Sequence, residues 1–408
     1  MLVLVINCGS SSLKYELFDM KNGVSLADGL AERVGIAGGN NAVLNYRRRG
    51  NEKIEMAVSM PDHRVAVSLV LKALADPEHG VINDLKDIKA VGHRVVHGGE
   101  KFAASVLITP EVIEAIEQFC ELAPLHNPAN LLGIRACQEL IPDTPHVAVF
   151  DTAFHQTMPK HAYLYGLPYE LYQELGVRRY GFHGTSHRYV CEVATGLLAE
   201  RGVPVEEQCI VTCHLGNGCS MAAVKGGKSI DTTLGFTPLE GLLMGTRCGD
   251  LDPALVPFLM DRLGLDTREV DTLMNKQSGL LGVSGVSSDM RDVHAAAAKG
   301  NERAKIAISL FCYRVRKYIG AYAAVMGGLH AVVFTAGIGE NDPEVRQRSI
   351  DGLEFLGIKI DQARNADPSI RGQITDISAT DARTRVFVIP TDEELLIARD
   401  TADFLNNS

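Results

Sequence analysis

The sequence lacks a long basic stretch, and this bears on its partners. Its 408 residues include 40 lysines and arginines against 50 aspartates and glutamates, a formal net charge of −10. The basic run from Arg47 to Arg49 is too short to form a nucleic-acid-binding patch. The charge balance therefore argues against general binding to nucleic acid.

The chain also lacks paired cysteine motifs and long apolar runs. Its nine cysteines are an odd number with no C-x-x-C pair, which favours reduced thiols in a cytoplasm over a disulfide framework. The apolar N-terminal run is too short for a signal peptide and has no basic leader. Residues 319–334 are interrupted by Gly327, Gly328 and His330, so they predict a buried helix followed by a strand. We expect a soluble cytoplasmic protein without membrane contact.

The common nucleotide-binding motifs are incomplete. Residues 227–229 match the end of a Walker A motif, but Ala222 stands where its first glycine belongs. Gly337 and Gly339 begin a G-x-G-x-x-G pattern, which Asp342 leaves unfinished. The protein-kinase motif set is missing as well. Any ATP site in this chain must therefore hold phosphates in another way.

The most informative stretch is Cys209 to Gly235. It predicts a three-stranded meander, with strands at 210–212, 220–224 and 229–233 and a tight Asn-Gly turn inside His214 to Gly218. A turn of glycine, asparagine and small side chains lets backbone N–H groups approach an anion, phosphate above all. A plain structural hairpin fits the same pattern.

The N-terminus repeats this design. Leu2 to Ile6 and Tyr15 to Asp19 predict two strands joined by a small polar turn, with Lys14 just beyond the turn as a point charge for a phosphate. A chain of 408 residues is long for one core. The two hairpins therefore predict two related domains facing one nucleotide.

Polar residues lie at the ends of two predicted strands in the N-terminal half of the chain. Arg94 lies near a strand end, and a buried arginine there requires an anionic partner. Its neighbours His93 and His97 are interpreted as hydrogen-bonded structural residues. Asp151 directly follows the predicted strand 146–150, where it is either a catalytic or metal-associated carboxylate or a helix N-cap.

A second group of polar residues lies further along. His183 and His187 are four residues apart, but neither H-E-x-x-H nor a third ligand is nearby, so a zinc site is disfavoured. One histidine directed at a reaction centre, with Ser186 or His187 beginning a helix, is the preferred interpretation. Arg247 lies in a glycine-flanked loop.

Helical spacing and apolar runs predict further elements. Ser287 or Ser288 is expected to cap a helix. Helices are predicted at 62–75, 109–121, 129–140, 302–326 and 395–405, with Thr109 capping the second, and strands at 331–335 and 386–389.

Taken together, these residues resemble the acetokinase family, which lies within the superfold of sugar kinases, Hsp70 and actin. The resemblance covers essentially the whole chain, and its motifs are NCGSSSLK from Asn7, GHRVVHGG around Arg94, RYGFHGTSH, HLGNG, TAGIGEN and TDEEL. It implies an α/β, two-domain, duplicated ribonuclease H-like fold with an interdomain active-site cleft. The expected domains are 1–150, completed by 386–408, and a nucleotide-binding and dimerisation domain at 151–385.

The resemblance also implies roles in substrate binding and catalysis. Arg94 would bind the carboxylate of acetate, and Asp151 would be the catalytic carboxylate. His183 and Arg247 would stabilise the transition state. The pocket around the acetate methyl group would comprise Val96, Leu125, Phe182 and Pro238.

Nucleotide and metal ligands are implied in the same way. Asn7 and Glu393 would help to hold Mg²⁺ or Mn²⁺. The phosphate contacts would be Lys14, His214, Leu215, Gly216, Asn217 and Gly218, and the adenosine contacts Asp289, Met290, Arg291, Gly337, Ile338, Gly339, Glu340 and Asn341. Two residues depart from the family pattern: Cys8 replaces a usual alanine, and Met290 replaces a common phenylalanine.

The implied reaction is direct in-line phosphoryl transfer between ATP and acetate, giving ADP and acetyl phosphate. The resemblance also implies that the protein is a homodimer. A propionate or butyrate kinase of the same family is the main alternative, although Val96 favours acetate. A nucleotide-switched binding protein is disfavoured by the two arginines Arg94 and Arg247. A sugar kinase is disfavoured because the expected pocket is apolar.

Overall fold

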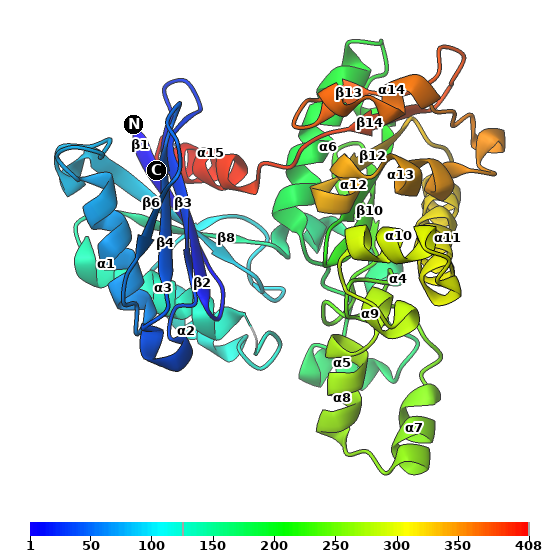
Figure 1. Cartoon of the computed structure of the whole chain (residues 1–408), viewed down its shortest axis with the longest axis horizontal. Helices are drawn as coiled ribbons and strands as arrows, with labels where there is room; N and C mark the ends of the chain where they lie inside the picture. Colours follow the sequence, from blue (N-terminus) through cyan, green and yellow to red (C-terminus); the bar gives the residue numbers. More distant parts are fainter. Residues whose placement is uncertain (125, 407–408) are drawn as a thin grey trace. The chain divides into compact units, whose positions relative to one another are not determined.

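The computed structural model describes residues 1–124 and 126–406, which divide into two units (Figure 1). Unit 1 comprises Met1–Phe154 and the C-terminal segment from Asp392, and unit 2 comprises His155–Thr391. We expected the C-terminal contribution to the first domain to begin at residue 386. Instead, β14 (Arg385–Val388) pairs with β12 (Ala331–Thr335) in the sheet of unit 2, so the chain returns to unit 1 only after that strand.

Each unit is built on one mixed sheet, and the six strands of the unit 2 sheet follow the same order as six of the eight strands in the unit 1 sheet. The order is β5-β4-β3-β2-β1-β6-β8-β7 in unit 1 and β11-β10-β9-β12-β14-β13 in unit 2. In both sheets an antiparallel meander (β1 to β3, β9 to β11) is followed by two strands parallel to its first strand. The α/β class and the duplication predicted from the two hairpins are therefore confirmed.

The strands have the following bounds. In unit 1 they are β1 Leu2–Cys8, β2 Ser12–Asp19, β3 Val24–Glu32, β4 Val43–Arg48, β5 Ile54–Ala57, β6 Ile88–Val95, β7 Val106–Leu107 and β8 His146–Phe150. In unit 2 they are β9 Cys209–Leu215, β10 Cys219–Lys225, β11 Lys228–Thr232, β12, β13 Thr375–Asp376 and β14.

The helices are distributed as follows. Unit 1 contains α1 His63–Leu74, α2 Pro110–Gln118, α3 Asn127–Leu140 and α15 Glu393–Asn406. Unit 2 contains α4 Lys160–Tyr163, α5 Tyr169–Leu175, α6 Gly184–Ala199, α7 Leu255–Leu263, α8 Thr267–Lys276, α9 Gly279–Ser284, α10 Met290–Ala298, α11 Glu302–Met326, α12 Ala336–Asn341, α13 Pro343–Ile350 and α14 Gln362–Ala366. Thr109 occupies the N-cap position of α2, as predicted, but its side chain makes no capping hydrogen bond.

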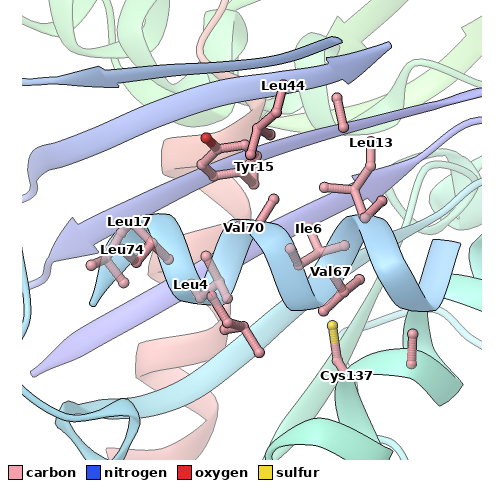
Figure 2. Packing of buried hydrophobic residues seen from close by; sticks show 14 of the residues in the cluster. Leu4, Ile6, Leu13, Tyr15, Leu17, Leu44, Val67, Val70, Leu74 and Cys137 are labelled. Atoms are coloured by element: carbon pink, nitrogen blue, oxygen red, sulfur yellow. The ribbon is translucent and has the colours of Figure 1, made fainter. Parts of the chain in front are cut away.

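The core of unit 1 lies between the sheet and α1 and α3. Alternate β1 residues such as Leu4 and Ile6 point into it, because side chains of a strand face opposite sides in turn. Figure 2 shows them packed against Val67 and Val70 of α1, with Cys137 of α3 nearby. This packing fixes the C-terminal end of β1, where the predicted polar turn begins.

Helix α15 packs on β1 and β6 of the same sheet. Gly92 of β6 faces it so closely that an added Cβ would lie 2.4 Å from Oγ1 of Thr401 and 2.8 Å from Ile397. Glycine is therefore required at this strand position. The contact places the first residues of α15 beside the functional residues of unit 1. Among the described residues, no helix has the length and apolar character that a membrane span needs.

Candidate active site

An arginine–carboxylate pair forms the centre of the unit 1 site. Arg94 of β6 and Asp151, which follows β8, come together because these neighbouring strands are parallel. Arg94 Nε donates to Asp151 Oδ1 at 2.9 Å, and Nη2 donates to Oδ2 at 2.5 Å. This is a bidentate pair in which the Asp151 side chain is only 1% exposed. The carboxylate of Asp151 therefore holds Arg94 in one orientation.

Asn7 and Glu393 extend this cluster. Arg94 Nη1 lies 3.4 Å from Oδ1 of Asn7, and Arg94 Nε lies 3.6 Å from Oε2 of Glu393, the first residue of α15. Burial opposes the charge on Arg94, but Asp151 and Glu393 more than offset it and raise the pKa of Arg94. The guanidinium group is therefore cationic at any working pH.

Lys14 lies on β2 near this cluster. Its ammonium pairs with Glu394 at 2.7 Å, and its side chain remains 49% exposed. Burial lowers the pKa of Lys14, but Glu394 raises it by more, so the net shift is upward. Glu394 was not predicted from the sequence as a partner of Lys14; the two adjacent acidic residues at the start of the last helix were the available signal.

The other predicted residues of unit 1 have separate outcomes. Val96 is buried, and its N–H donates to Oδ1 of Asn130 at 3.1 Å. His93 is a structural residue, as predicted: Nε2 lies 2.9 Å from Nδ1 of His146, and burial lowers the pKa of His93 well below its ordinary value. Leu125, predicted for the acetate pocket, lies outside the described residues.

His183 is the most unusual residue of the unit 2 site. It has a left-handed backbone with φ of 56° at the N-cap position of α6, and the helix begins at Gly184 rather than at Ser186 or His187 as expected. Such a conformation is costly for a residue with a side chain and persists only where the surroundings impose it. Its ring stacks on His214, with the centroids 4.2 Å apart.

The predicted catalytic residues of unit 2, His183 and Arg247, both lie near Gly218, at the turn between β9 and β10. A Cβ added there would lie 3.7 Å from Nε2 of His183 and 3.7 Å from Nη1 of Arg247. Arg247 and the ring edge of His183 that carries Nε2 therefore face the same turn. The sequence placed these residues far apart, and the fold makes them neighbours.

Arg247 is held in place by neutral groups. Its Nη1 donates to the carbonyl oxygen of Pro238 at 2.8 Å and lies 3.7 Å from the sulfur of Met244. Burial lowers the pKa of Arg247. In the described part of the chain no carboxylate pairs with it, unlike Arg94. A partly buried cation held by neutral groups is suited to receive an anion.

The predicted phosphate turn is open at its tip. Gly216 N–H donates to the Gly218 carbonyl at 3.1 Å, and the Asn217 carbonyl accepts from Gly245 N–H at 2.9 Å. Asn217 is exposed, whereas Leu215 and the preceding His214 are buried. His214 is fixed by its Nδ1, which lies 2.8 Å from Oγ of Ser186.

The predicted adenosine loops are also ordered by side chains. Glu340 Oε1 accepts from the Ala336 N–H at 2.8 Å, and buried Arg346 donates to the carbonyls of Gly339 and Glu340 at 2.9 and 2.8 Å. Asn341 Nδ2 donates to the Gly337 carbonyl at 2.9 Å. These contacts hold the short helix α12, which includes Ile338, in place.

At the second adenosine loop, the helix cap differs from the expectation. Asp289, not Ser287 or Ser288, is the N-cap of α10, because its carboxylate accepts from the Arg291 N–H. Asp289 also pairs with the exposed Arg291 guanidinium at 2.6 Å. Met290 is only 4% exposed. Asp289 and Arg291 are therefore the accessible residues of this predicted contact.

His183 and His187 do not form a metal site among the described residues, where no cluster of three or more histidine, cysteine, aspartate or glutamate side chains is placed to hold a metal ion. Instead, the buried ring of His187 bonds to Thr212 and Ser220. These two hydroxyl groups were not predicted from the sequence, where their only signal was their place in the predicted meander.

The two α/β units repeat one order of six strands. Unit 1 carries an arginine–carboxylate cluster, and unit 2 carries glycine-rich turns beside a histidine and an arginine. These features fit the class of ATP-dependent phosphotransferases. A family model described as the acetokinase family matches residues 2–399. The chain belongs to this family.

Individual relatives agree with this assignment. The acetate kinase of Methanosarcina barkeri is 60% identical over 405 residues, covering 99% of this chain and 97% of the relative. The acetate kinase of Halothermothrix orenii is 58% identical over 402 residues, covering 98% and 99%. The crystal structure of Porphyromonas gingivalis acetate kinase matches with a TM-score of 0.93 at 50% identity, covering 99% of both chains. A propionate kinase from Francisella tularensis matches with a TM-score of 0.89 at 43% identity, covering 98% and 99%.

Proposed function

We propose that this chain transfers a phosphoryl group between ATP and acetate, giving acetyl phosphate and ADP, as an acetate kinase. Full-length similarity to acetate kinases supports the activity, and the bidentate Arg94–Asp151 pair is the observation that carries the assignment of the acetate site. Acetate is already a deprotonated nucleophile, so the reaction needs no strong general base. The main difficulty is bringing one anion close to another.

Cationic and hydrogen-bonding side chains meet that difficulty. Arg94 pairs with the acetate carboxylate, while Asp151 holds the guanidinium group in position rather than removing a proton. His183 and Arg247 donate to the equatorial oxygens of the transferring phosphoryl group, which passes directly from ATP to acetate in line. Val96, Phe182 and Pro238 contact the methyl group of acetate.

The nucleotide is held by the two types of loop in unit 2 and by Lys14 of unit 1. The turn at residues 214–218 contacts the phosphate oxygens, since Gly216, Asn217 and Gly218 leave its backbone open to a ligand. Residues 337–341 of α12 and the ion pair of Asp289 and Arg291 contact adenosine. The carbonyl and carboxylate contacts that hold α12 in place support this proposal.

A divalent metal fits the donor atoms of unit 1. Asn7, Glu393 and Asp151 present only oxygen ligands, and Mg²⁺ prefers oxygen and commonly takes one or two carboxylates together with substrate phosphates. Asn7 and Glu393 would hold it, and Mn²⁺ accepts the same ligands. When bound, the metal neutralises charge on the β- and γ-phosphate oxygens of ATP.

Unit 2 is also proposed to carry the contact of a homodimer. Helix α7 has no buried residue, and it exposes Leu255, Phe258 and Leu263 by 42%, 53% and 61%. Exposed apolar side chains gathered on one helix are typical of protein–protein contacts. A second copy of the chain would cover this helix.

Acetate-dependent formation of ADP by the purified protein, with Mg²⁺ present and then chelated, tests this function. The Arg94→Lys variant provides the comparison, because lysine keeps the charge but loses the bidentate geometry. We expect a KM for acetate at least about tenfold higher, equivalent to about 1.4 kcal/mol, with the KM for ATP less affected. An unchanged KM for acetate would remove Arg94 from the acetate site.

A further inference from the structure

A chain of buried hydroxyl and imidazole groups leads away from His183. His183 Nδ1 lies 2.8 Å from Oγ of Ser220, which lies 2.7 Å from Nε2 of His187, whose Nδ1 lies 2.7 Å from Oγ1 of Thr212. Ser220, His187 and Thr212 are each 0% exposed. They come from β10, α6 and β9, so the sheet and the helix together fix the chain of contacts.

The hydroxyl group of Ser220 couples the two histidines. It has one hydrogen and bridges two ring nitrogens, so it donates to one and accepts from the other. Burial, reinforced by His155 and His214, lowers the pKa of His187 well below its ordinary value, and its ring therefore carries a single N–H. The position of that hydrogen on His187 consequently decides which nitrogen of His183 is protonated.

Two arrangements satisfy this coupling. In the first, Thr212 donates to Nδ1 of His187, Nε2–H of His187 donates to Ser220, and Ser220 donates to Nδ1 of His183. In the second, every bond is reversed, and the Thr212 hydroxyl accepts instead of donating.

The hydroxyl group of Thr212 makes the first arrangement more favourable than the second. Throughout residues 1–124 and 126–406, the Thr212 hydroxyl group has one hydrogen-bond partner, Nδ1 of His187. The second arrangement therefore leaves the buried hydroxyl hydrogen of Thr212 unbonded. Leaving a buried donor without an acceptor is unfavourable. The first arrangement uses every donor of the chain of contacts.

We propose that Thr212, His187 and Ser220 are positioning residues that hold His183 as its Nε2–H tautomer. The neutral ring then donates from Nε2, the nitrogen that faces Gly218 beside Arg247, to an oxygen of the transferring phosphoryl group. This inference rests on the proposed role of His183 in catalysis. Because this tautomer already carries a hydrogen on Nε2, His183 does not need to take up a proton before the reaction.

Nitrogen-15 NMR of the full-length protein, labelled at histidine, tests the tautomer directly. The His183 signals are assigned by their loss in a His183→Gln variant. We expect Nδ1 of His183 to resonate as an unprotonated nitrogen and Nε2 as a protonated one. A proton on Nδ1 of His183 would overturn the proposal.

The variant Ser220→Ala tests the coupling. Without the hydroxyl group the two tautomers of His183 mix, so the NMR signals shift towards an average. We expect kcat to fall at least about tenfold, because a catalytic histidine in the wrong tautomer loses much of its effect, while both KM values change little. Signals and kcat that both stay as in the wild type would overturn the proposal.

A matched control and a second variant complete the design. Ser378→Ala also removes a buried serine hydroxyl from unit 2, one bonded to Asp376 and Val386 instead of a histidine, and should leave the His183 signals and kcat unchanged. If Ser220→Ala does not fold, Thr212→Val removes the donor that selects the tautomer, and Thr212→Ser restores it. Unaltered His183 signals in Thr212→Val would overturn the proposal. Normal turnover by His183→Gln would instead refute the catalytic role of His183, without affecting the tautomer assignment.

Discussion

Arg94 and Arg247 are two partly buried arginines whose charges are balanced in different ways. Arg94 is held by the carboxylate of Asp151 at 2.5 Å. Arg247 contacts the carbonyl of Pro238 and the sulfur of Met244, with no carboxylate paired to it in the described residues. The first arginine is therefore a fixed part of unit 1, and the second is poised for an anion that arrives with the substrate.

This difference gives a prediction for Arg247→Ala. Removing one electrostatic donor to a transition state typically costs about 10²–10³ in kcat. We expect that loss here without any loss of stability, because a partly buried cation with no carboxylate partner contributes little to folding. Steady-state kinetics and thermal unfolding of the same preparation measure both quantities. Near-normal turnover would refute the catalytic role of Arg247.

At the scale of elements, the β9–β10 turn depends on its lack of side chains. Gly218 has no positive φ, and a Cβ there would make ordinary contacts of 3.6–3.7 Å with His183 and Arg247. Gly218→Ala should therefore fold normally but occupy space proposed for phosphate. We expect the KM for ATP to rise about tenfold, equivalent to about 1.4 kcal/mol of binding.

Gly196→Ala is the control for that substitution. Gly196 lies within α6, is exposed, and has no atom within 4 Å of an added Cβ. Alanine there should raise the free energy of unfolding by about 0.5–1 kcal/mol, because glycine is unfavourable inside a helix. The KM for ATP should stay unchanged. A KM raised equally in both variants would argue against a phosphate contact at the turn.

A second prediction at this scale concerns the link between α10 and α13. His294 Nε2 lies 2.8 Å from Oδ2 of Asp342, the N-cap of α13, and Glu344 lies 3.6 Å from Nδ1. The hydrogen bond to Asp342 raises the pKa of His294. Its stabilising contribution is therefore complete below the unfolded pKa of about 6.5 and is lost as pH rises through the folded value.

The variant His294→Gln tests this pH dependence. Burial raises the pKa of Asp342, but its contacts with His294 and Val345 outweigh burial and lower it, so the carboxylate is charged well below neutral pH. We expect the substitution to reduce the free energy of unfolding more at pH 6 than at pH 9, as measured by urea unfolding. An equal loss at both pH values would contradict the ion pair.

Local sequence patterns predicted many elements well. The bounds of β8, α11 and β12 agree with the predictions, because each is an apolar run or a helical repeat with clear ends, such as Asn301 and Gly327 around α11. The left-handed conformation of His183 was not predictable, since tertiary contacts impose it. The pairing of Lys14 with Glu394 was missed for a similar reason: it requires the last helix to return to the first sheet.

At the scale of the whole molecule, the repeated strand order explains why functional residues gather at corresponding places. Asn7 is the second-to-last residue of β1 in one meander, and His214 is the second-to-last residue of β9 in the other. The resemblance to the acetokinase family assigned roles to both, and the shared topology shows that they occupy similar sheet positions. Side-chain partners such as Ser220 and Thr212 were not predictable from either source.

The proposed homodimer gives a prediction at this scale. Phe258→Asp places a charge on the exposed apolar face of α7 and should shift the protein from dimer to monomer. Sedimentation velocity measures the shift, with Asp261→Asn on the same helix as a control that should remain dimeric. A Phe258→Asp variant that sediments as a dimer would place the contact elsewhere.

The central claim is best tested by trapping the acyl phosphate product as its hydroxamate, from ATP and Mg²⁺ with acetate, propionate or butyrate in turn. The account predicts product from acetate well above that from the larger acids. One added methylene group is worth only about 1–3 kcal/mol in an apolar pocket, so some product from propionate is expected. No hydroxamate from any of the three acids, with only slow ATP hydrolysis, would contradict the account.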